Sequence, residues 1–238
     1  MIPKKPKSIA GIPLEGAMER LLKKLENQPQ KLEPIVNQSN IKEDNYIFVP
    51  SMNIYIAKQR THLGLNWYDT HKQLHSEGLV MPTINEFREF LKYLKENPHG
   101  VPGASPSEVG RILDDILAVK DPWRAEWLDA DFKVDNNELY IHYNHRTVSG
   151  RLVPQNKELV TDYLTQDKTP GIDLDSWIQN ANVHGLPKPK VKKGDLYYRS
   201  PLNDNNSVAR FFAYSDRVGL DCYRYPIFSN SSLGVRSV

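Results

Sequence analysis

The chain ends, over residues 207–238, with the stretch SVARFFAYSDRVGLDCYRYPIFSNSSLGVRSV. Two series of residues interleave in it. A half-buried strand alternates apolar and polar side chains with a period of two, but one of these series mixes aromatic rings, carboxylates, aliphatic chains and glycine. That series would make a poor core face, because Asp216 and Asp221 would be buried without partners. It would also make a poor solvated face, because its rings would meet water. Tyr, Ser, Asn, Gly and Asp mixed on one surface are typical of a binding surface.

We call this mixed series the C-terminal set. Its members are Phe212, Tyr214, Asp216, Val218, Gly219, Asp221, Tyr223, Tyr225, Ile227, Phe228, Asn230 and Ser232. The residues between them, such as Phe211, Ala213, Leu220 and Cys222, form the second series. We expect the second series to face the interior and the C-terminal set to face outward.

The composition of this part of the chain is also unusual. After Lys193 there is no Lys, Glu, Gln, Met or Trp, although Lys and Glu are abundant before it. These five residue types are the ones that a codon ending in a pyrimidine cannot encode. Asn codons whose adenines are randomised yield every residue of the C-terminal set and none of the missing five. Chance composition of a short, turn-rich tail is the alternative.

The second series resembles the variable region of diversity-generating retroelement proteins, most closely the archaeal variable proteins of the AvpA kind, known from Nanoarchaeota-related lineages. The resemblance lies in the pattern Ser-Val-Ala-Arg-Phe-x-Ala-x-Ser-x-Arg-x-x-Leu-x-Cys-x-Arg-x-Pro and in the closing Leu-Gly-Val-Arg. It is weaker upstream, through residues 127–130 and 139–143. The closing Gly234, Val235 and Arg236 are also similar to the Gly-Phe-Arg end of formylglycine-generating-enzyme-like domains.

In that family a reverse transcriptase copies a template repeat and misincorporates bases at adenines, so that Asn codons become diversified. The resemblance therefore implies a C-type lectin fold, of the formylglycine-generating-enzyme-like and retroelement variable protein subclass, that presents the C-terminal set as one ligand-binding surface. The implied ligand is a macromolecule, a protein or surface component of a host, symbiont or virus. The ligand's identity and the oligomeric state stay open.

The whole-chain properties fit a globular protein. The 238 residues carry 39% hydrophobic and 25% charged residues, and the formal net charge of +2 gives no argument for nucleic acid or a membrane as partner. The single cysteine, Cys222, excludes an intrachain disulfide. No apolar run approaches the roughly 18 residues of a membrane span, and the amino terminus lacks the apolar core of a signal peptide. We expect cytoplasmic synthesis, with any display on a cell surface or virion left unexplained.

The sequence predicts an N-terminal arm over residues 1–45 and a domain over residues 46–238, with the variable region at about 207–238. In the arm we expect one short helix over residues 15–27, followed by a polar linker. In the domain we expect a strand pair over residues 46–57, two strands over 127–134 and 138–144, and a continuation over 153–163 whose type the pattern leaves open.

Four helices are expected in the domain. They begin near Asn66, after Thr83, after Ser105 or Ser107, and near Asp173. Thr83 and Glu86 have the spacing of a capping box. Helices first and short strands later indicate an α+β fold.

Other functions are open but less favoured. His71 and His75 have the i, i+4 spacing of a zinc pair, yet surface histidines on an amphipathic helix are the preferred interpretation. A structural or partner-contact role is preferred for His142 and His145. Cys222 could act as a nucleophile, but we expect it to be a buried structural thiol. We therefore expect no enzyme activity and no cofactor.

A calcium site and a nucleic-acid site are the remaining alternatives. Asp129, Asp131, Asp135 and Asn136 form an acidic cluster without the glycine and glutamate of an EF-hand loop, and the calcium-lectin signatures Glu-Pro-Asn, Gln-Pro-Asp and Trp-Asn-Asp are also absent, so a calcium-dependent lectin is disfavoured. The regularly spaced arginines of the tail are Arg210, Arg217, Arg224 and Arg236. Interleaved with aromatic rings, they would suit nucleic acid, but we expect them to tie the backbone through carbonyls and carboxylates.

Overall fold

A computed structural model describes residues 8–9, 12–13 and 43–238 of the chain. The chain divides into two units, Met1–Ile35 and Val36–Val238. In the first unit, β1 (Ser8–Ile9) pairs antiparallel with β2 (Ile12–Pro13). The helix expected over residues 15–27 lies outside the described residues. So does the expected linker, except for its last residues, which form the 3₁₀ helix η2 (Glu43–Asn45).

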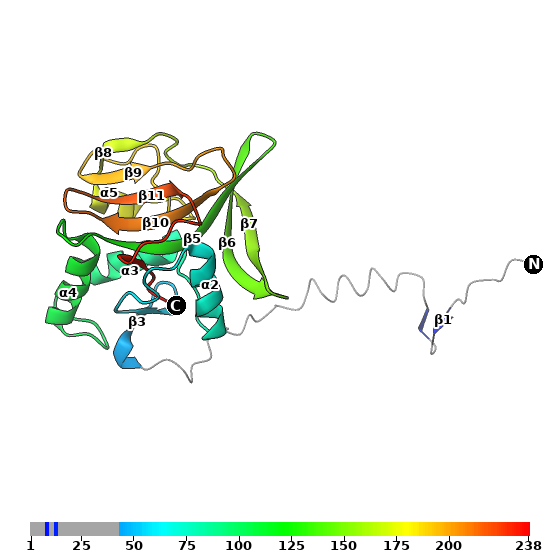
Figure 1. Ribbon diagram of the computed structural model, residues 1–238, viewed down its shortest axis with the longest axis horizontal. Helices are drawn as coiled ribbons and strands as arrows, with labels where there is room; N and C mark the ends of the chain where they lie inside the picture. Colours follow the sequence, from blue (N-terminus) through cyan, green and yellow to red (C-terminus); the bar gives the residue numbers. More distant parts are fainter. Residues whose placement is uncertain (1–7, 10–11, 14–42) are drawn as a thin grey trace, which may run out of the picture. The chain divides into compact units, whose positions relative to one another are not determined.

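The second unit is built on one mixed sheet of eight strands, which Figure 1 shows across the upper part of the molecule. Its strands are β5 (Arg124–Asp135), β6 (Glu138–Val148), β7 (Arg151–Leu159), β8 (Lys168–Ile172), β9 (Leu196–Arg199), β10 (Ser207–Ala213), β11 (Val218–Arg224) and β12 (Leu233–Gly234). The order across the sheet is β7-β6-β5-β10-β11-β9-β8, and β12 pairs parallel with β5. The carboxy-terminal hairpin β10–β11 therefore lies in the middle of the sheet.

Local signals place the helices where the sequence predicted them. They are α2 (Trp67–Ser76), α3 (Ile84–Glu96), α4 (Pro106–Leu117) and α5 (Leu174–Asn180). Thr83 and Glu86 form the expected capping box of α3, and Ser105, rather than Ser107, is the N-cap of α4. Each cap satisfies backbone N–H groups that have no partner within the first turn. Together with the sheet, these helices make the domain an α+β structure.

The expected strand pairs are also present. β3 (Tyr46–Val49) pairs antiparallel with β4 (Ile54–Ala57). β5 and β6 are longer than predicted and meet at Asn136 and Asn137, which both have positive φ, 49° and 64°. Asparagine tolerates this left-handed conformation better than most residues, so the pair suits a tight hairpin turn.

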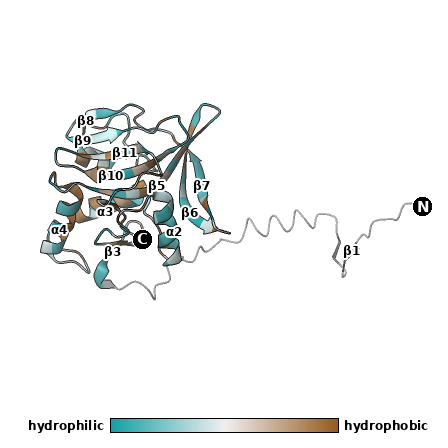
Figure 2. Cartoon of the chain, viewed as in Figure 1, coloured by the Kyte–Doolittle hydropathy of each residue, from teal (hydrophilic) through white to brown (hydrophobic). Residues whose placement is uncertain are grey.

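Two hydrophobic clusters lie on opposite faces of the sheet. The larger one contains α3, α4 and the side chains of Phe211, Leu220 and Cys222. The smaller one contains Trp67 and Trp127. Figure 2 shows hydrophobic residues on β5 and β10 at the middle of the molecule, and a largely hydrophilic β7 at its edge. The centre of the sheet is therefore covered on both sides.

The carboxy terminus returns to the start of this unit. Thr61 and Val235 exchange two backbone hydrogen bonds of 2.8 and 3.0 Å, and Val80 and Val238 exchange two of 2.9 Å. The amide of Ala57 also donates to the carbonyl of Ser237 at 2.9 Å. The last six residues, 233–238, are all buried. Residues 233–238 are thus an interior part of the fold, beside the pair of β3 and β4, and Figure 1 shows the carboxy terminus near β3.

Candidate functional site

The alternation within the tail separates the two faces of the β10–β11 hairpin. Phe211 pairs with Leu220, and the next pair is Phe212 with Gly219. Because successive side chains of a strand point to opposite faces, the first pair faces the larger cluster and the second faces the other side. Over these strands the two series separate at Phe211 and Leu220 against Phe212 and Gly219, but the expectation is wrong for Val218, which pairs with Ala213 and packs against the larger cluster. Cys222, expected to be buried, has no exposed surface.

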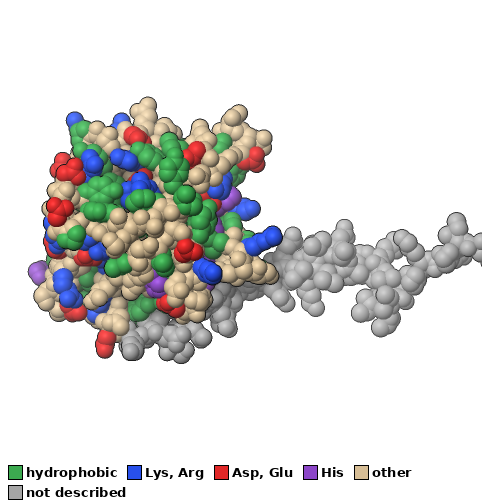
Figure 3. Space-filling model, in the orientation of Figure 1, with side chains coloured by type: hydrophobic (Ala, Val, Ile, Leu, Met, Phe, Trp, Pro, Cys, Tyr) green, Lys and Arg blue, Asp and Glu red, His purple; other side chains and the backbone are tan. Residues whose placement is uncertain are grey.

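Most of the C-terminal set is accessible to solvent. Asp216, Tyr225 and Ile227 are exposed, the last two to 55% and 74%. The half-buried members are Tyr214, Val218, Tyr223, Phe228, Asn230 and Ser232. Figure 3 shows hydrophobic side chains beside Lys and Arg side chains over β9, β10 and β11. This face has the mixed character that the sequence predicted.

Three members of the set are buried, and the expectation that they face solvent is wrong. Phe212 is 2% exposed because its ring lies in the smaller hydrophobic cluster. Gly219 is buried beneath that ring. Asp221 has no exposed surface, but it is not unpaired: the Nε–H of Arg210, itself 2% exposed, donates to its Oδ2 at 3.0 Å. A buried aspartate was not expected because the sequence does not show that Arg210 lies opposite Asp221 in the hairpin.

The close contact at Gly219 leads to a prediction. A Cβ there would lie 2.6 Å from Cζ of Phe212 and 2.7 Å from the carbonyl oxygen of Tyr197, and the latter is backbone and cannot rotate away. We expect Gly219→Ala to lower the free energy of unfolding by about 1–3 kcal/mol through overpacking, measured by urea denaturation. Gly110→Ala is the matched control, because Gly110 lies within α4 with no atom in reach of an added Cβ.

That control should raise stability by about 0.5–1 kcal/mol, since alanine orders more readily than glycine in a helix. If the two variants changed the free energy of unfolding equally, position 219 would accept a side chain. Gly219 would then count among the replaceable members of the C-terminal set.

Cations and aromatic rings alternate across the accessible face. The guanidinium carbon of Arg224 lies 3.6 Å from the ring centre of Phe228, and that of Arg199 lies 5.3 Å from the ring centre of Tyr223. Arg210 contacts two aromatic members of the set that are distant in sequence. Its guanidinium lies 5.7 Å from the ring centre of Phe228 and donates to the hydroxyl of Tyr214 at 2.8 Å. Such stacking holds the rings in place without a hydrophobic cover.

Three buried guanidinium nitrogens beneath this face have no acceptor within the described part of the chain. They are Nη1 of Arg210, Nε of Arg217 and Nε of Arg224. At the turn between β10 and β11, a pocket of about 370 Å³ is lined by Asp216, Arg217 and Val218, together with residues of α4, α5 and the start of β9. The face therefore offers rings for stacking, with a recess at one end of the hairpin.

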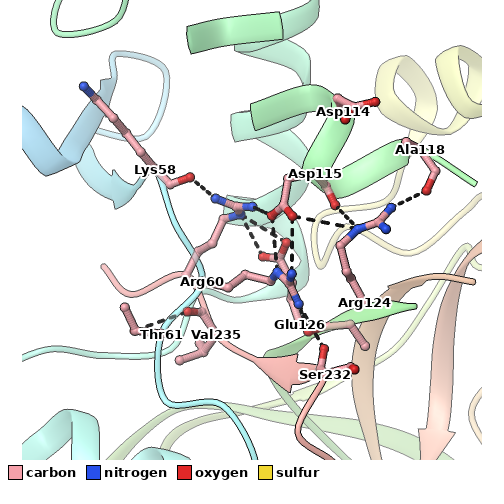
Figure 4. A network of polar contacts seen from close by, with 12 residues as sticks. Lys58, Arg60, Thr61, Asp114, Asp115, Ala118, Arg124, Glu126, Ser232 and Val235 are labelled. Atoms are coloured by element: carbon pink, nitrogen blue, oxygen red, sulfur yellow. Dashed lines mark hydrogen bonds and ion pairs between the residues drawn. The ribbon is translucent and has the colours of Figure 1, made fainter. Parts of the chain in front are cut away.

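The remaining arginine, Arg236, has the structural role that was expected. Its side chain has no exposed surface, and its Nε–H donates to Glu126 at 3.1 Å while Nη2 donates to Asp115 at 2.5 Å. Figure 4 shows Arg60 and Arg124 reaching the same Asp115 from other elements. Burial alone would raise the pKa of Asp115, but the three arginines outweigh it and hold this pKa below its usual range.

The interpretation of the histidines was wrong for His71. This residue has no exposed surface and lies near Asp129 and His145, which are 2% and 3% exposed. Burial lowers the pKa of His71 and keeps its ring neutral. His75, on the same helix, is only half-buried. The signal that was missed is the spacing of Trp67, His71 and Leu74, which puts His71 on the buried stripe of its helix.

The acidic cluster does not converge on one point. Asp129 faces the two buried imidazoles, whereas Asp131 pairs with Lys133 at 2.7 Å and Asp135 is exposed. A calcium ion needs six or more oxygen ligands. These carboxylates, which have separate partners, do not supply such a set within the described residues.

Comparisons of the chain with protein-family models, with curated proteins and with solved structures found no match. Among the described residues, none of the helices combines the length and the apolar character needed to cross a membrane.

Proposed function

We propose that the chain is a ligand-binding protein whose accessible C-terminal set is a hypervariable surface, diversified by an adenine-directed retroelement and carried on a C-type lectin fold. The observation that carries the proposal is the placement of the tail. Residues of the second series, such as Leu220 and Cys222, lie in the core, while Tyr223, Tyr225 and Ile227 remain accessible beside them. Variation at accessible positions leaves folding intact, because few core contacts depend on their side chains.

The lectin fold is supported by the meeting of the domain's two ends. In a C-type lectin fold the terminal strands of the domain pair with each other. Here Thr61 and Val235 form an antiparallel bridge, and the carbonyl of Leu233 accepts from the amide of Gly64 at 3.0 Å. The segment between these contacts and β11 is thereby held at both ends while its middle, including Ile227, stays at the surface.

The chemistry of the accessible face favours a macromolecular ligand. Aromatic side chains supply large contact area at a low entropic cost, and neighbouring polar groups give specificity. Tyr225 and Ile227 protrude, while Tyr223 and Phe228 are held against arginines. We propose a protein or surface component of a host, symbiont or virus as the partner, because a diversified surface is useful against a target that changes.

The rival functions have less support. Arg210 and Arg236 are buried against carboxylates, so they are turned away from any phosphate backbone. Burial raises the pKa of the Cys222 thiol well above its usual value, which removes the thiolate that a nucleophile requires. The proposal therefore includes neither nucleic-acid binding nor a catalytic step. Nucleic-acid binding whose affinity fell steeply with salt would contradict it.

A triple substitution tests whether the surface is separable from the fold. We expect Tyr223→Ser, Tyr225→Ser and Ile227→Ser together to change the free energy of unfolding by less than about 1.5 kcal/mol, as exposed substitutions usually do. The control is the single change Leu220→Ser, at a neighbouring residue with no exposed surface. It should cost about 3 kcal/mol or more through the loss of buried methyl groups. A triple variant as unstable as the control would show that these side chains belong to the core.

A selection experiment tests binding itself. The accessible members of the set are encoded by randomised, pyrimidine-ending codons, the library is displayed on yeast, and it is selected against purified lysozyme, streptavidin and serum albumin. We expect binders with micromolar or lower dissociation constants. A matched library on exposed positions of β7, such as Arg151, Gln155 and Lys157, provides the control. Equal yields from both libraries would contradict a specialised surface.

The retroelement part of the proposal has a separate test in the neighbouring DNA. We expect a near-copy of the coding sequence for residues 207–238 that differs mainly at adenines, beside a gene for a reverse transcriptase. A flanking sequence without such a copy would contradict diversification by a retroelement. The proposal that this face binds ligands would then be tested by the selection experiment alone.

A further inference from the structure

Three buried titratable side chains lie together beside Trp67 of the smaller hydrophobic cluster, where apolar side chains would be usual. His71 comes from α2, Asp129 from β5 and His145 from β6, and all three are buried. One ligand atom of each lies within 4.8 Å of the others. These residues are separate from the C-terminal set, and the proposed function does not use them.

The hydrogen bonding around Asp129 is one-sided. Its Oδ1 lies 2.5 Å from Nδ1 of His145, and its Oδ2 accepts from the backbone amide of His145 at 2.9 Å. Its distance from Nε2 of His71 is 3.5 Å, too long for a good hydrogen bond. His71 in fact has no hydrogen-bond partner at either ring nitrogen among the described residues. A buried imidazole with both nitrogens unused is costly, because native interiors satisfy nearly all such groups.

An aromatic side chain also packs against the two imidazoles of the cluster. The ring of Trp67 lies edge-on to both imidazoles, with its centre 4.3 Å from that of His71 and 5.0 Å from that of His145. The indole nitrogen of Trp67 donates to the carbonyl of Leu128 at 3.0 Å, which fixes its position. Low polarity around a set of ligands strengthens their attraction for a cation.

We propose that His71, Asp129 and His145 bind a zinc-class divalent cation that fastens α2 to β5 and β6. Imidazole nitrogens and carboxylate oxygens are both ligands that Zn²⁺ takes, and with three of them from the protein a water molecule would complete a tetrahedral site. Tetrahedral coordination at zinc bond lengths separates ligand atoms by about 3.3 Å. The pair His71–Asp129 is already close to this separation, and the pair His145–Asp129 has to open by somewhat less than 1 Å as the proton between them leaves.

Refolding in the presence of metal is the direct test, since the ligands are buried and a cation enters most easily before the core closes. The full chain is refolded with ZnCl₂ or CoCl₂, dialysed, and its metal content measured. We expect one cation per chain, a higher melting temperature than after refolding with chelator, and intense visible absorption bands of tetrahedral Co²⁺. A metal-free product, or Co²⁺ with only the weak bands of an octahedral aqua complex, would overturn the proposal.

Two variants separate this site from adventitious binding. His71→Leu removes a ring that makes no hydrogen bond in the described residues, so the metal-free protein should stay folded, as circular dichroism would show. We expect it to lose at least 100-fold in Zn²⁺ affinity. His142→Ala is the control: it lies on the same strand as His145 but outside the cluster, and should bind Zn²⁺ as the parent does. Unchanged affinity in His71→Leu would overturn the proposal, whatever the control shows.

Discussion

Replacing Arg236 by methionine is expected to lower the free energy of unfolding by about 3–5 kcal/mol, the usual cost of removing one partner of a buried ion pair. Arg236 has no exposed surface, and its Nε–H lies against Glu126, which is 3% exposed. Methionine keeps much of the apolar stem, so the loss comes mainly from the carboxylate left without its cation. Urea denaturation, monitored by tryptophan fluorescence, measures the change.

The size of this effect follows from the number of segments that meet at Arg236. Besides Glu126 on β5, it donates to Asp115 on α4 and to the carbonyl of Lys58 after β4. Figure 4 shows Lys58, Asp115 and Glu126 converging on one place from these separate elements. The guanidinium suits this task because it offers five donors in a fixed plane. One side chain near the end of the sequence therefore fastens the tail to segments from the first half of the domain.

Arg217→Met is the matched control for this prediction. The side chain of Arg217 is 33% exposed, and its partner Asp216, at 3.4 Å, is 62% exposed. An ion pair so well solvated contributes only about 0–1 kcal/mol. If Arg236→Met were as mild as this control, the arginine network would not hold the tail in place.

Sequence patterns located the helices well, because the signals that start a helix are local. Thr83 and Glu86 specify their capping box within four residues, and the structure confirms it. The alternation of the tail separated most residues of its two faces, but not Val218, and it did not predict that Phe212, Gly219 and Asp221 are buried. These patterns depend only on backbone geometry, which repeats with the same period in every protein.

The order of the strands could not be derived in the same way. β10 lies between β5 and β11, and β11 pairs parallel with β9, so neighbours in the sheet come from distant parts of the chain. The burial of Asp221 depends on this arrangement, because Arg210 reaches it from the facing strand. A one-residue slip of β11 would move Asp221 to the other face and away from Arg210. Sequence patterns carry too little information to fix such a register.

The cluster of His71, Asp129 and His145 was missed for a related reason. Each residue was considered with its sequence neighbours, so His71 was compared with His75 and not with residues of β5 and β6. The spacing of Trp67, His71 and Leu74 indicated a buried histidine, but not what would face it. Partners that are 58 or more residues away become visible only when the helix is placed against the sheet.

Replacing Asp221 by alanine is expected to lower the free energy of unfolding by about 3–5 kcal/mol, because it leaves the cation of Arg210 buried without its partner. The two side chains are 1% and 3% exposed and lie 3.0 Å apart. Asp221 also accepts a hydrogen bond from the backbone amide of Tyr223 at 3.3 Å, so its loss would disturb the end of β11. Thermal and urea unfolding both measure this cost.

Asp216→Ala provides the comparison, because Asp216 belongs to the same C-terminal set but is exposed, and its replacement should change stability by no more than about 0.5 kcal/mol. The contrast bears on diversification as well as on folding. If Asp221 fastens the hairpin, a diversified gene should keep aspartate there while position 216 changes freely. Equal tolerance at the two positions would mean that Arg210 finds another partner, and Asp221 would then return to the replaceable part of the surface.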